Sequence, residues 1–486
     1  MTTPDTTAPS TDVSTIDPDN HFLTYAPQRA AEVEVYRAPS IVACIIPAYN
    51  EESTIAAVLE SVLAQSRLPD VVHVVVNNTT DDTYWIAREY CGRHDIDYRG
   101  VQQSTEIFIH DVGRMADRKV GALNYGFDLL GEDVDYVIGV DGDTTPHPKA
   151  FERLLAEAES DSRIGGVSAI YSIDTHGHRG PIANFLVVGQ RAQFASFTLL
   201  NLCRGRNMAV LGGQCSIFSA RALRHVKQSY NQKTPWVNDS EVEDSLLSLQ
   251  IRSAGYLTKI SSTARADVGG MTTLRALDAQ QVKWNYGAID LMWPGERGNL
   301  RGQPFHPNLR LRWYENIEML LNFVVRVGFV LLLLASLSIG AFSFQWWWLI
   351  PPVLATLLNL RVALTMENRT TKDILFALLF FPAEIYMWIK IGHFLRAWTR
   401  FLSRVNTDNW GDQAKAEQGK GGWKYLGPLL ALVIVVIIAV GMWLSMPTNA
   451  QVIALWIGWP IQAAVTLILC LIMVRRLTRR QYGYRV

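Results

Sequence analysis

The chain has 486 residues, which is enough for two or three domains of ordinary size. Lysine plus arginine and aspartate plus glutamate each total 45, so the formal net charge is zero and nothing indicates a protein that binds nucleic acid through phosphate contacts. The five cysteines are scattered and odd in number, which excludes a zinc or redox site built on closely spaced pairs.

The N-terminal segment, residues 1–38, is rich in Thr, Pro, Ser and Asp. It lacks the basic and apolar regions of a signal peptide. We therefore predict a disordered tail.

Residues 39–270 alternate short apolar runs with helical stretches, a pattern that predicts an α/β domain with a mostly parallel sheet. Three of the runs end in polar residues: IVACIIPAYN (41–50), VVHVVVNNTTDD (71–82) and DYVIGVDGD (135–143). Ligands of such sheets bind outside the carboxyl ends of the strands. The three polar sets therefore predict one site.

Asp141 and Asp143 stand two apart at a predicted strand end. Their oxygens suit Mg²⁺ or Mn²⁺ bridging a diphosphate, and Lys119 is a candidate phosphate partner. Asp244 begins a predicted helix whose dipole would keep its carboxylate ionised. Taken singly, the two aspartates are better explained as a solvated turn and Lys119 as a surface lysine, while Asp244 is equally well explained as a helix N-cap.

The C-terminal part is apolar, and we predict interfacial helices over residues 271–316 followed by a membrane domain over 317–486. Spans are expected at about 317–342, 346–366, 426–446 and 452–474. Segment 374–404 carries charges and is predicted to be an amphipathic interfacial helix. Segments 396–424 and 475–486 are basic, and basic loops favour the cytosolic face of a membrane, so we expect both segments to lie in the cytosol. A fifth span with inverted C-terminal topology is the alternative.

The order of the motifs is more specific than any one of them. In chain order they are IPAYNEE (46–52), VVVNNTTDDT (74–83), KVGALNYGF (119–127), VDGDTTP (140–146), VEDSLLSLQIRSAGY (242–256) and QQVKW (280–284). The set, with membrane spans after it, resembles the processive, membrane-integrated family-2 glycosyltransferases, which include cellulose, hyaluronan, chitin and poly-N-acetylglucosamine synthases. The resemblance covers residues 41–475 and implies a GT-A-type, Rossmann-like domain joined to a helical transmembrane bundle.

The resemblance also implies roles for individual residues. Tyr49, Glu51 and Asn78, with Asn77 as an alternative, match donor positions around the base, although most members have Asp where this chain has Asn. Lys119, Asp141 and Asp143 match the diphosphate and metal positions. Asp244 matches the general base, with Glu243 beside it on the acceptor side.

The QQVKW motif resembles the Q-x-x-R-W signature of the family. Gln280 and Trp284 match acceptor-binding positions, since Trp offers a flat face to a sugar ring and Gln bonds to hydroxyls. Lys283 replaces the usual Arg and lacks its planar fork.

Together these features predict inverting, metal-dependent transfer from a nucleotide-diphosphate sugar, expected to be UDP-linked, to a growing glycan at the inner membrane surface, with export as an associated expectation. The alternative is transfer of a single sugar to a polyprenyl phosphate, lipid or protein. A dead transferase-like scaffold is the third reading, and the carboxylates it would lack are present. The expected location is a multi-pass inner or plasma membrane with the catalytic domain in the cytosol; the sequence is compatible with an oligomer, and nucleic acid is not an expected partner.

Overall fold

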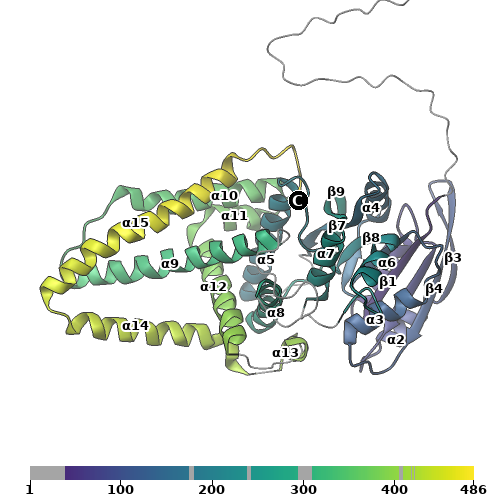
Figure 1. The fold of residues 1–486 in the computed structure, drawn as a ribbon, viewed down its shortest axis with the longest axis horizontal. Coiled ribbons are helices and arrows are strands. Elements are labelled where there is room, and N and C mark those ends of the chain that lie inside the picture. Colours follow the sequence, from purple (N-terminus) through teal and green to yellow (C-terminus); the bar gives the residue numbers. More distant parts are fainter. Residues whose placement is uncertain are drawn as a thin grey trace, which may run out of the picture. The chain divides into compact units, whose positions relative to one another are not determined.

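The apolar runs form the middle of a nine-stranded sheet within the described residues. The computed structural model (Figure 1) describes residues 39–174, 180–237, 242–293, 309–403, 409–417, 419–420 and 422–486. The predicted tail, 1–38, lies outside them. The strands are β1 Val42–Ala48, β2 Val71–Val76, β3 Gly92–Tyr98, β4 Val101–Asp111, β5 Tyr136–Val140, β6 Thr144–Pro146, β7 Ile164–Ile173, β8 Cys215–Ser219 and β9 Leu257–Val268.

The sheet has the order β3-β4-β2-β1-β5-β8-β7-β9-β6. Pairs β4-β2, β2-β1, β1-β5 and β7-β9 are parallel. Pairs β3-β4, β5-β8, β8-β7 and β9-β6 are antiparallel. The expectation of a mostly parallel sheet is therefore corrected to a mixed one, because β8 enters antiparallel between β5 and β7 and short or hairpin strands close both edges.

Helices cover both faces of the sheet, which is why its central strands are continuous apolar runs. All seven residues of β1 are buried, with Cys44 and Ile46 in one core and Ala43 and Ile45 in the other. Helices α1 and α4 pack on the first face, and α3 and α6 contribute to the second.

The helices vary widely in length. In the sheet region they are α1 Ile55–Leu63, α2 Thr83–Arg88, α3 Arg118–Asp128, α4 Ala150–Glu159, α5 Pro181–Leu202, α6 Ala220–Ser229 and α7 Glu243–Ser253. Those that follow are α8 Leu274–Met292, α9 Arg310–Ser338, η2 Trp346–Leu349, α10 Ile350–Thr365, α11 Thr371–Leu378, α12 Phe380–Leu402, α13 Asn409–Glu417, η3 Trp423–Leu426, α14 Gly427–Ser445 and α15 Thr448–Thr478.

Four of the described helical segments are long and apolar enough to cross a membrane. They are α9, η2 with α10, α14 and α15. Helix α15 packs along α9 and α10, as Figure 1 shows. Their outward faces are strongly apolar, and no residue of α14 is buried. Such faces are compatible with contact to lipid.

The segment predicted as one interfacial helix over 374–404 is divided in two. Helices α11 and α12 meet at 84° around Leu379, which has an extended backbone. Pro382 in the first turn of α12 has no N–H to donate to the carbonyl of Leu378, which disfavours one continuous helix through this point. Arg396 then pairs with Asp278 of α8, and Arg400 pairs with Asp412 of α13.

Helix α5 holds the sheet region to the helices that follow it. The guanidinium of Arg191 on α5 forms a bidentate ion pair with the carboxylate of Asp373 on α11, with N–O distances of 2.9 and 3.0 Å. Both side chains are buried. Two residues earlier, Gly189 lies against the ring of Tyr386 on α12. The interface depends on an ion pair and on the small size of Gly189.

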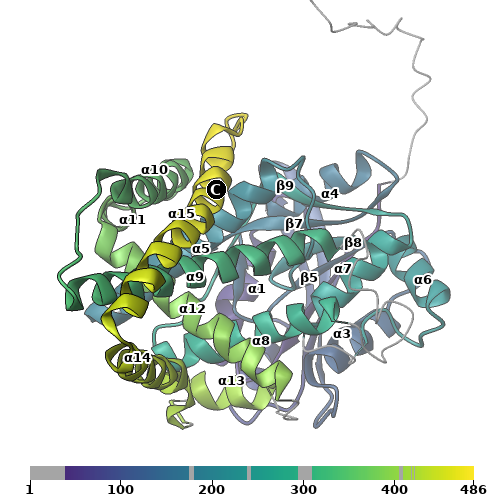
Figure 2. The ribbon, with the colours of Figure 1, turned by 60° about the vertical axis from the view of Figure 1, so that its left-hand side comes forward.

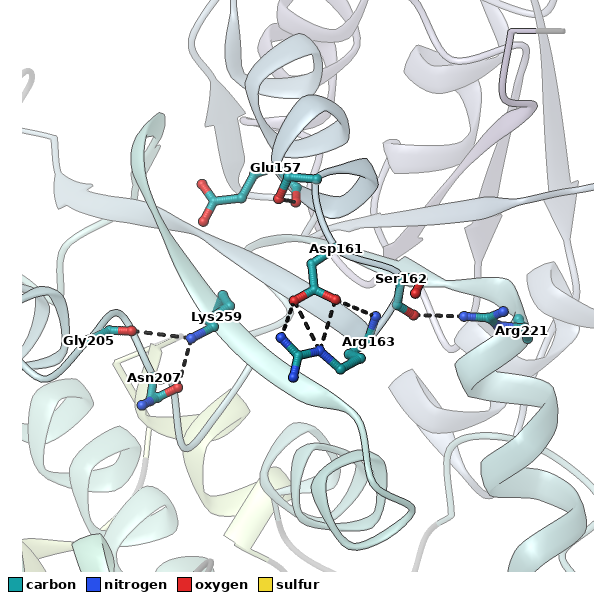
Figure 3. A network of polar contacts seen from close by, with 9 residues as sticks. Glu157, Asp161, Ser162, Arg163, Gly205, Asn207, Arg221 and Lys259 are labelled. Atoms are coloured by element: carbon teal, nitrogen blue, oxygen red, sulfur yellow. Dashed lines mark hydrogen bonds and ion pairs between the residues drawn. The ribbon is translucent and has the colours of Figure 1, made fainter. Parts of the chain in front are cut away.

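A polar network anchors the loop that follows α5 (Figure 3). The ammonium of Lys259 on β9 donates to the carbonyl oxygen of Gly205 and to Oδ1 of Asn207, at 3.3 and 3.0 Å. Beside them Arg163 pairs with Asp161 at the start of β7. The network fixes one end of the segment that runs on to β8.

We predict that Gly189→Ala loosens the contact between α5 and α12. A Cβ atom at this position would lie 2.2 Å from the Tyr386 ring, so the helices must separate, at a cost of about 1–3 kcal/mol. Thermal unfolding of the full chain in detergent should show a lower midpoint. Gly392→Ala is the control, because its Cβ would meet only Pro428 at an ordinary 3.7 Å. Equal midpoints for the two variants would contradict the prediction.

Candidate active site

The polar sets predicted to converge do meet at one edge of the sheet. Strand β1 pairs with β2 on one side and with β5 on the other, all parallel, so their carboxyl ends lie together. Tyr49 and Glu51 follow β1, Asn78 follows β2, and Asp141 follows β5. Tyr49 is exposed there.

A lysine and three carboxylates form the centre of the site. The Nζ atom of Lys119 on α3 lies 2.7 Å from Oδ1 of Asp141 and 3.6 Å from Oε1 of Glu243 at the start of α7. Asp244 accepts a 2.8 Å hydrogen bond from the backbone N–H of Gly213. Elements far apart in the chain thus bring four charged side chains together.

Gly213 is the point around which these groups are arranged. A Cβ atom there would lie 2.6 Å from Nζ of Lys119, 3.0 Å from Oδ1 of Asp141 and 3.1 Å from Oδ2 of Asp244. A side chain at position 213 would therefore displace these charged groups from their positions. The sequence analysis did not single it out, although the Gly-Gly pair at 212–213 just before a buried strand signals a close backbone approach.

The cluster shifts the proton affinities of its members. Burial alone would lower the pKa of Lys119, but Asp141, Asp244 and Glu243 hold that pKa well above its usual value. Desolvation, then the charge of Glu243, raises the pKa of Asp244 to about 7, against the opposing effect of Lys119. Asp244 is consequently poised to exchange a proton near neutral pH.

Glu51 supports the backbone between the two aspartates. Its Oε2 accepts a 2.7 Å hydrogen bond from the hydroxyl of Thr54, which also donates to the carbonyl oxygen of Gly142 at 2.9 Å. A Cβ atom on Gly142 would lie 2.9 Å from Cγ of Glu51. Glu51 is thereby placed to set the path of the Asp-Gly-Asp turn.

The two asparagines after β2 contact backbone. Asn78, at a positive φ of 58°, accepts from the N–H of Met115 and donates to the carbonyl oxygen of the same residue, at 2.9 and 3.0 Å. Asn77 donates to the carbonyl oxygen of Arg118 at 2.7 Å. Both hold the loop before α3, and so they help to position Lys119.

Helix α8 carries Gln280, Lys283 and Trp284 and lies beside α12 and α13, as Figure 2 shows. Trp284 meets Phe194 of α5 edge-to-face with ring centroids 6.1 Å apart, Lys283 is buried, and Gln280 is partly exposed. Gly287 of the same helix is in close contact with Val242, the residue before the Glu243-Asp244 pair. The motif helix is thus tied to the carboxylate cluster through backbone packing.

The residues present fit a divalent cation held jointly with a substrate. Among the described residues no group of three His, Cys, Asp or Glu side chains could hold a metal alone. Asp143 follows the turn and its Oδ1 accepts from Thr144 at 3.2 Å, while Asp141 faces Lys119. Mg²⁺ commonly binds through one or two carboxylates plus phosphate oxygens and water, and two such carboxylates are here.

Two family models match the chain. Residues 43–227 match the model described as glycosyl transferase family 2, and residues 136–360 match the one described as glycosyl transferase family group 2. Together they span nearly all of the sheet, the cluster, α8, the first apolar helical segment and most of the second.

Several solved structures are similar to parts of this chain at low sequence identity. A mannosyltransferase from Pyrobaculum calidifontis, in complex with GDP-Man and Mn²⁺, is 16% identical over 76% of this chain and 90% of its own, with a TM-score of 0.46. Glucosyl-3-phosphoglycerate synthase from Mycobacterium tuberculosis, in complex with Mg²⁺ and UDP, is 18% identical over 50% of this chain and 75% of its own, with a TM-score of 0.31.

Proposed function

We propose that this chain is a glycosyltransferase that transfers a sugar, with inversion, from a nucleotide-diphosphate sugar to a hydroxyl of a growing glycan at the membrane surface. The matches of residues 43–227 and 136–360 to two glycosyl transferase family models support the reaction class. The observation that carries the proposal is the position of Asp244. It lies beside Lys119 and Asp141 at the strand ends, held by the N–H of Gly213.

In this proposal Asp244 is the general base. Its pKa of about 7 allows it to take the proton of the attacking hydroxyl at neutral pH. The hydrogen bond from Gly213 fixes one carboxylate oxygen and leaves the other to face the acceptor. Glu243, whose charge raises the pKa of Asp244, makes the base stronger.

The donor side uses the other half of the cluster. Asp143, with Asp141, would hold Mg²⁺ or Mn²⁺, which when bound neutralises charge on the departing diphosphate. Lys119 supplies a positive charge at the same place. Its ammonium group lies near Asp141 and Glu243, and a bound diphosphate would compete with these carboxylates for it. Tyr49, Glu51 and Asn78 lie where a nucleoside would extend past the ends of β1 and β2.

The acceptor side uses α8. Gln280 and Trp284 would bind sugar rings of the acceptor, and we assign Lys283 and Glu243 to the same acceptor side. Its packing against Val242 and α12 places this helix between the catalytic pair and the helices that could cross a membrane, which favours an acceptor presented at the membrane. We place the catalytic domain on the cytosolic side, where the basic flanks of the helices are expected.

We predict that the purified full chain makes a polymer when incubated with its nucleotide sugar and Mg²⁺ or Mn²⁺. Each radiolabelled nucleotide sugar would be tested in turn and the product sized by gel filtration, with the sample lacking metal as control. In inverted membrane vesicles, label that accumulates inside would support coupled export. A product that carries only one added sugar would contradict elongation and support the alternative, transfer of a single sugar.

We predict that Asp244→Asn and Asp143→Ala separate chemistry from donor binding. Asp244→Asn should lower transfer by about 10²–10⁴-fold, the usual contribution of a general base, while donor affinity stays nearly unchanged. Asp143→Ala should instead weaken binding of the nucleoside diphosphate with Mn²⁺ but not without it. Titration calorimetry and initial rates distinguish the two. Unimpaired transfer by Asp244→Asn would remove Asp244 from the role of base.

We predict that transfer falls as pH drops through about 7, because Asp244 acts only when deprotonated. Glu243→Gln removes a neighbouring negative charge that raises the pKa of Asp244, so the acid limb should move to lower pH. The measurement is kcat/KM against pH for both proteins. An acid limb that stays in place in Glu243→Gln would mean that it reports another group.

A further inference from the structure

Arginines from three separate elements gather where α15 ends against the sheet region. Arg476 and Arg479 stand at the end of α15, Arg361 on α10, and Arg204 directly after α5. We call these four residues the arginine junction. Arg361 donates to the carbonyl oxygens of Arg476 and Arg479, and thereby caps α15.

Arg204 joins the junction from the sheet region. Its guanidinium lies 5.3 Å from the ring centroid of Tyr314 on α9. Burial, then the charges of Arg476 and Arg479, lowers the pKa of Arg204, which places all three cations within electrostatic reach of one another. The network of Lys259 with Gly205 and Asn207 holds the adjacent backbone in place (Figure 3).

Positive charge at this place exceeds negative charge. Glu318 of α9 is already bound by both terminal nitrogens of Arg476, and Glu315 is bound by Arg312 at 3.1 Å. Counting these described side chains, five arginines meet two glutamates. Like charges brought together in partial burial are costly unless an anion binds among them.

Two nitrogens of the junction lack a partner among the described residues. They are Nε of Arg476 and Nη1 of Arg479, and both atoms are buried. Guanidinium N–H groups are strong donors, and burying one without an acceptor costs free energy. Planar guanidinium groups match phosphate oxygens in geometry and charge.

A chain of contacts links the junction to helix α7. Arg312, which binds Glu315 near Arg204, lies 3.5 Å from the hydroxyl of Ser245, the residue after Asp244. The helix ends that form the junction belong to α10 and α15, two of the segments apolar enough to cross a membrane. A ligand held here would have an apolar helix surface on one side and the catalytic helix α7 on the other.

We infer that the arginine junction binds the phosphate group of a membrane lipid. The inference rests on the proposed position of α10 and α15 in a membrane, and it holds whether the lipid is an acceptor or an anionic headgroup that supports activity. Clusters of basic residues at the membrane ends of helices commonly bind anionic lipid headgroups. Neither role is needed for the growing-glycan reaction proposed above.

The test measures binding of a short-chain prenyl monophosphate and of phosphatidylglycerol to the full chain in neutral detergent, without donor. The prenyl alcohol of equal length and inorganic phosphate are the ligand controls. We expect Arg479→Gln and Arg204→Gln each to weaken binding of at least one phosphate lipid by about tenfold or more. Arg475→Gln removes the same charge from an exposed position in the last turn of α15 and should change binding little.

The outcomes separate the two sources of the phosphate. Transfer of labelled sugar onto the prenyl phosphate would make the lipid an acceptor. Stimulation by phosphatidylglycerol without its glycosylation would make it an activating headgroup. Equal losses in Arg475→Gln and Arg479→Gln, equal binding of inorganic phosphate, or no binding of either lipid would each overturn the inference. Because binding is read without donor, failure of the proposed reaction leaves this result interpretable, and thermal midpoints check that each variant is folded.

Discussion

The site depends on the balance of charge around Lys119. One ammonium group lies among Asp141, Glu243 and Asp244, and these come from the end of β5 and the start of α7. Without that cation, three carboxylates would have to share a partly buried space. With it, the charge of Lys119 offsets part of the effect of burial on Asp244, whose pKa is about 7. A single lysine thus opposes the repulsion among the neighbouring carboxylates.

The backbone around this balance is held at several separate points. Asn77 and Asn78 fix the loop before α3, Glu51 supports the Asp-Gly-Asp turn, and the N–H of Gly213 orients Asp244. Each of these contacts has a backbone group as one partner or supports a backbone turn. Rigid support of this kind lets charged groups keep a fixed geometry, which is what a preorganised site requires.

Ion pairs also hold together the helices that follow the sheet. Arg326 of α9 pairs with Glu384 of α12 at N–O distances of 2.6 and 2.9 Å, and Arg191 of α5 pairs with Asp373 of α11. In helices apolar enough to enter a membrane, unpaired charges would be costly, so paired ones indicate interior faces. The arginine junction departs from this rule, since its cations outnumber its described anions.

The sequence by itself determined the α/β class, the strand ends that carry the polar residues, and four apolar helical segments, because these follow from local periodicity and from the length of uncharged runs. It also indicated Lys119, Asp141, Asp143 and Asp244, through the order of motifs. The tertiary structure decided what no local pattern contains. Antiparallel insertion of β8 makes the sheet mixed, and Gly213 approaches three charged groups from distant segments. Both are contacts between residues far apart in the chain, and sequence spacing does not report such proximity.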